Sequence, residues 1–559
     1  MLVRTIVRWS YTLFLALATV VLSAVGSYVF APSAQWPGPI EWLTDTISLF
    51  KMSWHPPAGA AVPWPLQAAR ITGAFFTLSA LVEVWMKFFG EQMTLLRLSL
   101  WRRHVVVCGL GRKGQRLAFE FRRRGKRVVI ADIAPDEDDT QLCSRRGILI
   151  KKGDASKNVT LETAGAERAD TLFAVCRDDH TNLEIGMETL ARFTASRRKN
   201  KLTCYVHLVN LPLRVLLRRH QLLETRPPGF DLRFFNIYEN TARALFAAFP
   251  LEEAAGDLEK RVHLIIVGLT RLGEAVATQA ARIGHYRDLQ RVKVTIIDEQ
   301  AEMRGEQFLT RHPAMEEVCE LQFLSIRFTE LRFIHLSFLE DLAAERPMVV
   351  LCLEQDEANV SLALTLAEHT GGKIPVLANV GDRNGLARLL SASTSELKHK
   401  GICIFGAVEE VCGWDLLREE ELDILAKLIA QHFHDRHEGP DWENSSEDRR
   451  NSNRAAADHI DVKLRAIGCR RGAAKDGQPP FAFTPEEVEL LARMEHRRWN
   501  ADHLLNGWVQ GQPRDDDRKI HDNLVPWDQL TEEARDKDRE QVGDLPSLLG
   551  KIGQAIQRA

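Results

Sequence analysis

The sequence predicts an α/β protein built from a two-helix membrane domain, two tandem doubly wound parallel sheets, and a small, mostly α-helical C-terminal domain. Three observations lead to this prediction. Two long apolar runs lie within residues 1–100, and short apolar strands alternate with amphipathic helices from residue 101 to residue 436. A segment rich in tryptophan, histidine and arginine then closes the chain. Alternation of strand and helix is the pattern of a parallel sheet.

Composition excludes several classes of protein. The 559 residues include 73 Lys and Arg against 76 Asp and Glu, a net charge of -3, so no basic excess indicates a nucleic-acid partner. The nine cysteines lie between Cys108 and Cys469 and form no CxxC pair. We therefore expect no structural zinc site or other metal centre, and a reducing, cytoplasmic compartment for everything after Cys108.

The membrane domain is expected at residues 1–100. The run Trp9–Phe30 carries no charge and is long enough to cross roughly 30 Å of hydrocarbon as a helix. A second run, Ile71–Phe89, carries only Glu83 and Lys87. Arginines precede the first run and follow the second, so the positive-inside rule places both ends of the chain in the cytoplasm of a bacterial-type inner membrane. A secretory signal peptide is the alternative interpretation of the first run.

The segment between the runs, residues 40–57 ("IEWLTDTISLFKMSWHPP"), is expected to re-enter the membrane. Its first part, Glu41–Phe50, suits a half-membrane helix, and irregular backbone beyond it is tolerable only where it lines water or is buried in protein. The segment has no TVGYG-like run of carbonyl groups and carries two prolines, so potassium selectivity is not predicted. The candidate pore residues are Lys51, Ser53, Trp54, His55 and Glu83. An extracytoplasmic cap without a pore is the alternative.

A dinucleotide-type glycine motif opens the first sheet domain, residues 101–255. Gly109, Gly111 and Gly114 follow a strand and open a helix. Such glycines permit a tight turn, a close approach of backbone to pyrophosphate, and close packing of helix on strand. Asp132 ends the next strand, where an acid accepts hydrogen bonds from a ribose. The alternative is a Rossmann-like domain that keeps these glycines for packing alone.

The second sheet domain, residues 256–436, repeats the first with a changed turn. Its motif reads Gly268, Thr270, Gly273, and the side chain of Thr270 would crowd a pyrophosphate. We therefore expect this copy to have lost nucleotide binding. Neither copy shows a catalytic constellation, so we expect no enzyme activity and a nucleotide that acts as a conformational ligand.

The first copy resembles the regulator-of-potassium-conductance domains, also called Trk-type nucleotide-binding domains, through "VVVCGLGRKGQRLA", "VVIAD", "KKGDAS" and "FAVCRDDHTNLEIG". The resemblance implies NAD(H) or another adenine nucleotide as ligand, and a symmetric ring of these domains beneath the pore of a homotetramer. The nucleotide positions that it implies are Gly109, Gly111, Arg112, Gly114, Asp132, Asp154, Asp179 and Asn182.

The chain is expected to continue as a polar linker, residues 437–478, and to end in a compact domain, residues 479–559. Through "EHRRWNADHLLNGWVQG" this domain resembles the ryanodine-receptor repeat domain. Aromatic faces beside basic side chains suit a phosphorylated nucleoside. The candidate ligand residues are Glu495, His496, Trp499, Trp508, Arg514, Lys519, His521 and Trp527. A helical protein-interaction module that uses them for its own core is the alternative.

Together these features predict a ligand-gated, weakly selective cation channel whose cytoplasmic nucleotide-binding ring and C-terminal sensor control the pore. Its partners would be the lipid membrane, inorganic cations and a nucleotide-type ligand. Such a protein suits a signal-triggered effector of stress or phage defence. The alternative is a non-conducting, membrane-anchored nucleotide sensor that regulates a separate transporter.

Overall fold

The computed structural model describes most of the chain. The described residues are 2–30, 38–51, 53–55, 61–196, 201–209, 227–252, 261–330, 333, 345–381, 401–406, 423–437, 440–442, 445, 447–474 and 481–558, without the side chains of 2–13, 30 and 83–97. These residues form two compact units, Met1–Trp101 and Arg102–Ala559. Each unit is described by itself.

The first unit consists of three helices, α1 (Leu2–Phe30), α2 (Pro39–Phe50) and α3 (Trp64–Leu100). Hydroxyl groups connect them. The Ser23 and Thr46 hydroxyls lie 2.8 Å apart and join α1 to α2, and the Thr77 hydroxyl of α3 donates to the carbonyl of Phe50 at 2.5 Å. Both Ser23 and Thr46 are buried. The short helix α2 is therefore fixed to both long helices by polar contacts.

None of the helices in the described part of the chain combines the length and the apolar character that crossing a membrane requires. The two spans expected over Trp9–Phe30 and Ile71–Phe89 stay predictions. The half-length helix expected over Glu41–Phe50 is confirmed as α2, which begins at Pro39 and also ends at Phe50.

The second unit begins with a six-stranded parallel sheet in the order β3-β2-β1-β4-β5-β6. The central strand β1 is buried along its whole length, as expected for a sheet covered by helices on both faces. This doubly wound order confirms the α/β prediction. The elements are β1 (Val105–Cys108), α4 (Arg112–Arg123), β2 (Val128–Asp132), α5 (Glu137–Arg145), β3 (Leu149–Lys152), α6 (Asn158–Thr163), β4 (Thr171–Ala174), α7 (Asp179–Ala195), β5 (Leu202–His207), β6 (Phe230–Phe235) and α9 (Ile237–Ala248).

A second parallel sheet repeats this topology. Its order, β9-β8-β7-β10-β11-β12, is that of the first sheet when each strand is numbered from the start of its own copy. The chain therefore contains tandem copies of one fold, as the sequence repeat predicts. The elements are β7 (Arg261–Val267), α10 (Arg271–Ile283), β8 (Lys293–Asp298), α11 (Ala301–Arg311), α12 (Met315–Val318), β9 (Glu320–Ser325), β10 (Glu345–Leu351), α14 (Asp356–Thr370), β11 (Val376–Asn379) and β12 (Ile402–Phe405).

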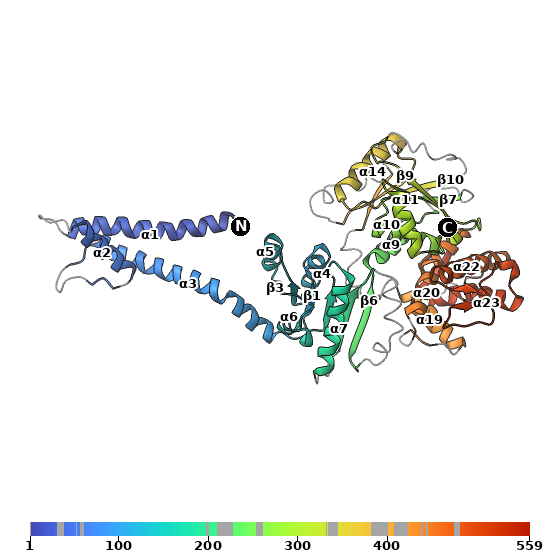
Figure 1. The fold of residues 1–559 in the computed structure, drawn as a ribbon, viewed down its shortest axis with the longest axis horizontal. Helices are drawn as coiled ribbons and strands as arrows, with labels where there is room; N and C mark the ends of the chain where they lie inside the picture. The colour runs from blue at the N-terminus through green and yellow to red at the C-terminus, as the bar shows by residue number, and fades with distance from the viewer. Residues whose placement is uncertain are drawn as a thin grey trace. The chain divides into compact units, whose positions relative to one another are not determined.

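Helix α9 belongs to the second sheet domain as much as to the first. It follows β6 in the chain but lies beside α10 (Figure 1). Its residues Ala242, Leu245 and Phe246 lie in the core cluster that includes β7, β8 and α10. Arg243 of the same helix pairs with Asp458 at 2.7 Å. The predicted boundary between residues 255 and 256 therefore falls after a helix that both domains need.

The stretch expected to be a polar linker, residues 437–478, is folded for most of its length. It contains α20 (Glu447–Asp458), α21 (Ile460–Ala466) and β13 (Cys469–Ala473). Its few apolar residues are small or spaced on one face, and Ile460, Leu464 and Cys469 are buried together with residues near the C-terminus. Strand β13 pairs antiparallel with β16 (Gln554–Arg558). These helices are part of the C-terminal domain because they complete its core.

The C-terminal domain is mostly helical and packs on the second sheet domain. Leu491 and Met494 of its long helix α22 share a core cluster with α10, and Arg282 of α10 pairs with Asp502 of α22 at 3.2 Å. A capping box at Thr484 and Glu487 starts α22. The remaining elements are α19 (Ile424–His437), α22 (Pro485–Leu505), β14 (Val509–Gln510), β15 (Ile520–His521), α23 (Glu532–Gly543) and α24 (Leu545–Gly550).

Candidate functional sites

The glycine turn after β1 has the geometry of an open phosphate cradle. Gly109 has φ +105°, which L side chains rarely adopt, and a Cβ atom on Gly114 would clash with the carbonyl oxygen of Gly109. A Cβ atom on Gly111, in contrast, would meet no atom within 4 Å. Gly111 caps α4 and Arg112 is its first residue, exposed beside the cradle. The first and third glycines are required by the fold, and the second leaves space for a ligand.

Two carboxylates lie at the ends of β2 and β3, next to this turn. Asp132 is half-buried and accepts the Leu110 amide at 2.6 Å and the Ala134 amide at 2.9 Å, so it holds the glycine turn in place. Asp154 accepts the amide and the hydroxyl of Ser156, and these hydrogen bonds lower its pKa. The Asp154 carboxylate is therefore ionised at neutral pH, and both acids lie at positions that a ribose would face.

Asp179 and Asn182 open α7 beyond β4, and the structure gives them structural partners. Asp179 accepts the Val209 amide at 2.9 Å. Asn182 is fully buried; its Oδ1 accepts the Cys176 amide at 2.7 Å, and its Nδ2 donates to the carbonyls of Cys176 and His207. The side chain of Asn182 therefore joins the ends of β4 and β5 and has no capacity left for a nucleotide.

The corresponding turn of the second sheet domain is filled by its own side chains. The Thr270 hydroxyl donates to the carbonyl of Cys352 at 2.7 Å and accepts the Gly273 amide at 3.3 Å. Asp298, which corresponds to Asp132, is buried and pairs with Arg304 at 2.8 Å. Thr270 therefore places a side chain at the position where Gly111 leaves open space in the first copy.

A cavity of about 660 Å³ lies in the C-terminal region, between α19 and α20 on one side and α22 to α24 on the other. Six of the eight residues proposed from sequence line it, namely His496, Trp499, Trp508, Arg514, Lys519 and His521. The structure thus brings together side chains that the sequence separates by up to 25 residues.

An aromatic cluster forms one wall of this cavity. The ring of His503 lies 3.9 Å from that of Trp499 and 5.1 Å from that of Trp508, and the ring of His521 lies 4.8 Å from that of Trp499. Burial lowers the pKa of His503 to about 4, so its imidazole is neutral at physiological pH. Its Nδ1 bonds to the carbonyl of Trp499 at 2.9 Å, which can only accept, and Nε2 is therefore left as an acceptor.

The polar residues of the cavity wall are held by neighbours. His496 is buried, with Nε2 2.8 Å from the carbonyl of Val525 and Nδ1 3.2 Å from Asp538. Arg514 pairs with Asp516 at 2.7 Å, and Lys519 donates to the carbonyl of Asn506 at 2.7 Å. Their positions are therefore fixed without a ligand.

Glu495 does not line the cavity. It is fully buried and accepts Lys463 Nζ at 2.7 Å and Arg498 Nη2 at 2.7 Å. These cations hold the pKa of Glu495 well below its usual range, against the effect of burial. Its role is to neutralise buried cations from α21 and α22, and this structural role replaces the ligand contact that we expected.

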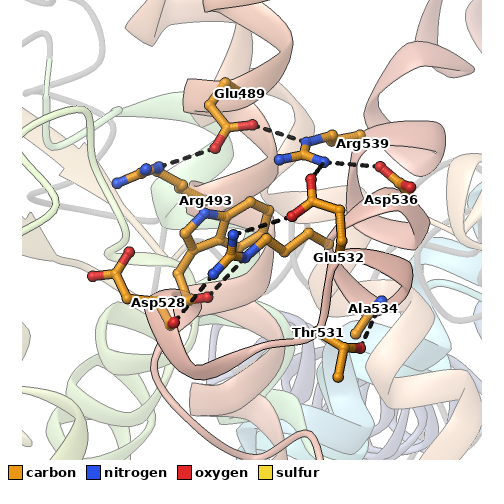
Figure 2. Close-up of polar contacts among 10 residues, drawn as sticks. Glu489, Arg493, Asp528, Thr531, Glu532, Ala534, Asp536 and Arg539 are labelled. Atoms are coloured by element: carbon orange, nitrogen blue, oxygen red, sulfur yellow. Dashed lines mark hydrogen bonds and ion pairs between the residues drawn. The ribbon is translucent and has the colours of Figure 1, made fainter.

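Trp527 also lies outside the cavity lining. It is 7% exposed, and the guanidinium groups of Arg493, Arg535 and Arg539 each lie 5.8 to 5.9 Å from its ring. Figure 2 shows that Glu489 bonds to both Arg493 and Arg539. Arg535 pairs with Glu532 at 3.2 Å, so carboxylates hold all three arginines. The indole and its arginines form a closed cation–π cluster that stabilises the domain.

Other cavity residues could not be found by sequence reasoning or were overlooked. His503 follows Trp499 by four residues on α22, so helical spacing alone could have placed it on the same face. Phe433, Arg436 and Arg449 contribute from α19 and α20. Arg449 was missed because α20 lies in the stretch that we expected to be a linker, and Phe433 and Arg436 were missed because α19 was assigned to the second sheet domain.

The pore candidates of the first unit follow α2. Lys51 and Ser53 are exposed, and the Ser53 amide donates to the carbonyl of Ser48 at 2.9 Å. Trp54 is half-buried with the guanidinium of Arg70 5.8 Å from its ring, and the exposed His55 bonds to the carbonyl of Ser53. Glu83 belongs to α3, but its side chain lies outside the described residues.

Comparison with known proteins identifies two domains within the chain. Residues 105–199 match the TrkA-N domain, and residues 484–558 match the RyR domain. Both matches confirm the resemblances inferred from the sequence. The first covers the open glycine turn, and the second covers the aromatic wall of the C-terminal cavity.

Individual relatives match over short segments. A protein of Methanothermus fervidus is 32% identical over 126 residues, which are 21% of this chain and 20% of that protein. The glutathione-regulated potassium-efflux system protein KefC of Klebsiella pneumoniae is 37% identical over 81 residues, 14% of this chain and 13% of KefC. The chain thus matches a fifth or less of the length of these curated relatives.

Solved structures of a channel named GsuK are similar at low identity. One has a TM-score of 0.40 at 14% identity and covers 74% of this chain and 99% of the GsuK chain. Another, GsuK bound to NAD, has a TM-score of 0.39 at 12% identity and covers 86% and 89%.

Proposed function

We propose that this chain is a nucleotide-regulated protein of ion transport. In this proposal an adenine nucleotide such as NAD(H) binds the first sheet domain as a conformational ligand and is not consumed by an enzyme reaction. The C-terminal domain serves as a second sensor. The whole chain acts as a homotetramer in a bacterial-type inner membrane, with both ends in the cytoplasm.

The observation that carries the proposal is the contrast between the two glycine turns. Gly111 leaves its cradle open, and the side chains of Asp132 and Asp154 lie beside it as hydrogen-bond acceptors. In the second copy, Thr270 has a side chain at the corresponding position, and Arg304 pairs with Asp298, the acid that corresponds to Asp132. The loss of these features in one copy supports a ligand-binding role for the other, since the fold itself forms equally well with both turns.

The link to ion transport comes from the TrkA-N match. The KefC segment that resembles this chain belongs to a protein named for potassium efflux, and we extend that association to this chain. The more specific proposal is a ligand-gated, weakly selective cation channel. A half-length helix, α2, fixed by hydroxyl contacts between two long helices favours it, because this is the arrangement of a re-entrant pore helix.

Calorimetry tests nucleotide binding. We expect the full-length chain to bind NAD, NADH or ATP, and Gly111→Val to weaken that binding at least about tenfold, since each lost bond from backbone to phosphate contributes roughly 1.5–3 kcal/mol. The matched variant Thr270→Val should leave it unchanged. An equal loss of nucleotide affinity in both variants would show that nucleotide binding has been assigned to the wrong copy or to only one of two binding copies.

Ion flux tests transport. Purified full-length protein in liposomes should pass monovalent cations, and the Gly111→Val variant should lose the response to nucleotide on the cytoplasmic side. If nucleotide binds and no flux occurs at any nucleotide concentration, the channel proposal is wrong. The alternative, a membrane-anchored sensor that regulates a separate transporter, would then stand.

A further inference from the structure

The C-terminal cavity has the size of a small-molecule site and is built from two distant parts of the chain. Its volume of about 660 Å³ falls within the range of roughly 300–1,000 Å³ that is usual for ligand pockets. Residues of α19 and α20 form one wall, and residues of the RyR domain form the other. The RyR match begins at residue 484, so the wall formed by α19 and α20 lies outside the matched domain.

The aromatic wall suits a flat heterocycle. Trp499 and Trp508 are half-buried, with His503 between them at ring distances of 3.9 and 5.1 Å. Indole faces stack on any nucleobase because every base has a π face. The neutral imidazole of His503 adds a hydrogen-bond acceptor beside them.

The charged groups of the cavity suit an anion. Seven lysines and arginines line it against five aspartates and glutamates. Among them, Arg498 is only 2% exposed and uses Nε and Nη2 to bond to Glu495 at 3.1 and 2.7 Å. Its Nη1 is buried and has no hydrogen-bond partner among the described residues. A buried guanidinium N–H without an acceptor is unfavourable, and a phosphate oxygen is the kind of acceptor that it lacks.

We propose that this cavity binds a nucleotide, with its base on Trp499 and Trp508 and its phosphate group held by Arg498 and Arg514. The proposal rests on the sensor role of the C-terminal domain for its effect on transport, but the binding step is independent of the glycine turn. Asp502 lines the same cavity and pairs with Arg282 of α10. A nucleotide in the cavity therefore lies against a residue that is attached to the second sheet domain.

The test uses the full-length chain with Gly111→Val, so that the glycine turn of the first sheet domain contributes no binding. Calorimetric titration with ADP, GDP, CDP and UDP should detect binding of at least one of them. If ADP binds, adenosine, which lacks the phosphates, and inorganic pyrophosphate, which lacks the base, should each bind at least tenfold more weakly than ADP. If another diphosphate binds, its own nucleoside replaces adenosine in this comparison.

Two variants in the same background assign the contacts. Trp508→Ala should weaken binding roughly 5- to 150-fold, the range of base–aromatic stacking at about 1.4 kcal/mol per tenfold change. Arg514→Gln should weaken diphosphate binding and leave nucleoside binding unchanged. Trp508 is half-buried and the Arg514 side chain is 53% exposed, so neither change should unfold the domain, which circular dichroism checks. Trp527→Phe is the control, because Trp527 lies in the same domain but outside the cavity lining, and it should leave nucleotide affinity unchanged.

The possible failures are distinct. If none of the four diphosphates binds the Gly111→Val chain, or if one binds equally well after Trp508→Ala and Arg514→Gln, the cavity is not a nucleotide site. If binding is also absent from the chain with Gly111 intact, the proposed nucleotide regulation fails as well. Binding that requires Gly111 alone would overturn the cavity proposal and leave the regulation proposal standing.

Discussion

Asn182 and Asn359 allow a sharp test of which residues near the glycine turns are structural. Both asparagines are fully buried, and each uses its amide group to join the ends of two neighbouring strands. Asn182 bonds to the amide and carbonyl of Cys176 and to the carbonyl of His207. Asn359 bonds in the same way to Leu353 and Asn379. An asparagine therefore makes the same structural contacts in the copy with the open turn and in the copy with the filled turn.

Replacement of either asparagine by alanine should destabilise its own sheet by a similar amount. Each change leaves a buried backbone N–H without a partner, which costs roughly 1–3 kcal/mol, and removes bonds to two carbonyls and some packing. We expect about 2–5 kcal/mol in each case, which corresponds to a rise of roughly 30-fold or more in the local opening equilibrium. The resemblance to the Trk-type nucleotide-binding domains had implied that Asn182 is a nucleotide contact.

Hydrogen exchange measures this locally, which is necessary because a chain with several domains does not unfold in two states. Amides of β4 and β5 should exchange faster in Asn182→Ala, and amides of β10 and β11 should do so in Asn359→Ala. In Asn182→Ala, the apparent nucleotide affinity should fall only in proportion to the fraction of the first sheet domain that is no longer folded. The reasoning would be refuted by an Asn182→Ala chain that keeps normal exchange and loses nucleotide binding.

Three further predictions follow from other parts of the chain. Bi-ionic reversal potentials should show poor discrimination between potassium and sodium, because the segment after α2 has no repeated carbonyl cage; a strong potassium preference would contradict this. Thr270→Val should lower stability by about 0.5–2 kcal/mol, measured by hydrogen exchange of α10, because it removes the N-cap hydroxyl. Burial lowers the pKa of His459 to about 4 in the folded protein, so this side chain binds a proton more readily after unfolding than before it. The contribution of His459 to the free energy of unfolding is therefore fully present above pH 6.5 and is lost as the pH falls toward 4. The loss is about 2 kcal/mol between pH 7 and pH 5. In denaturation of the C-terminal domain, His459→Gln should flatten this pH dependence.

The sheet domains could be predicted well because their signals are local. The strand around Val107 is a continuous apolar run, and the glycine spacing identifies the turn that follows it. The role of Thr270 was also predictable, since any side chain there occupies the cradle. The partners of Asn182 were not, because the carbonyl of His207 is 25 residues away and only the strand order brings it near.

The C-terminal region shows where composition misleads. The stretch 447–466 is polar overall, so it resembles a linker, yet its alanines and a few aliphatic residues are enough to bury one face of α20 and α21. Sequence spacing placed Trp499 and Trp508 together but could not distinguish them from Trp527. All three tryptophans lie near arginines in the sequence. Only the fold determines that Trp527 packs inward, with three arginine side chains around its ring.

The shared core around α9 has a consequence for the order in which the chain is made. Helix α9 leaves the ribosome before any other part of that core, whereas Leu491, Met494 and Val542 in the same cluster leave last. At a synthesis rate of roughly 5–20 residues per second, these late members follow α9 by on the order of 10 to 60 seconds. During that interval the face of α10 that packs against α22 has no final cover. A chain truncated before residue 479 would never acquire that cover, so a loss of its response to nucleotide would reflect an unfinished core as much as a missing sensor. Point changes in the cavity, such as Trp508→Ala, separate the two effects.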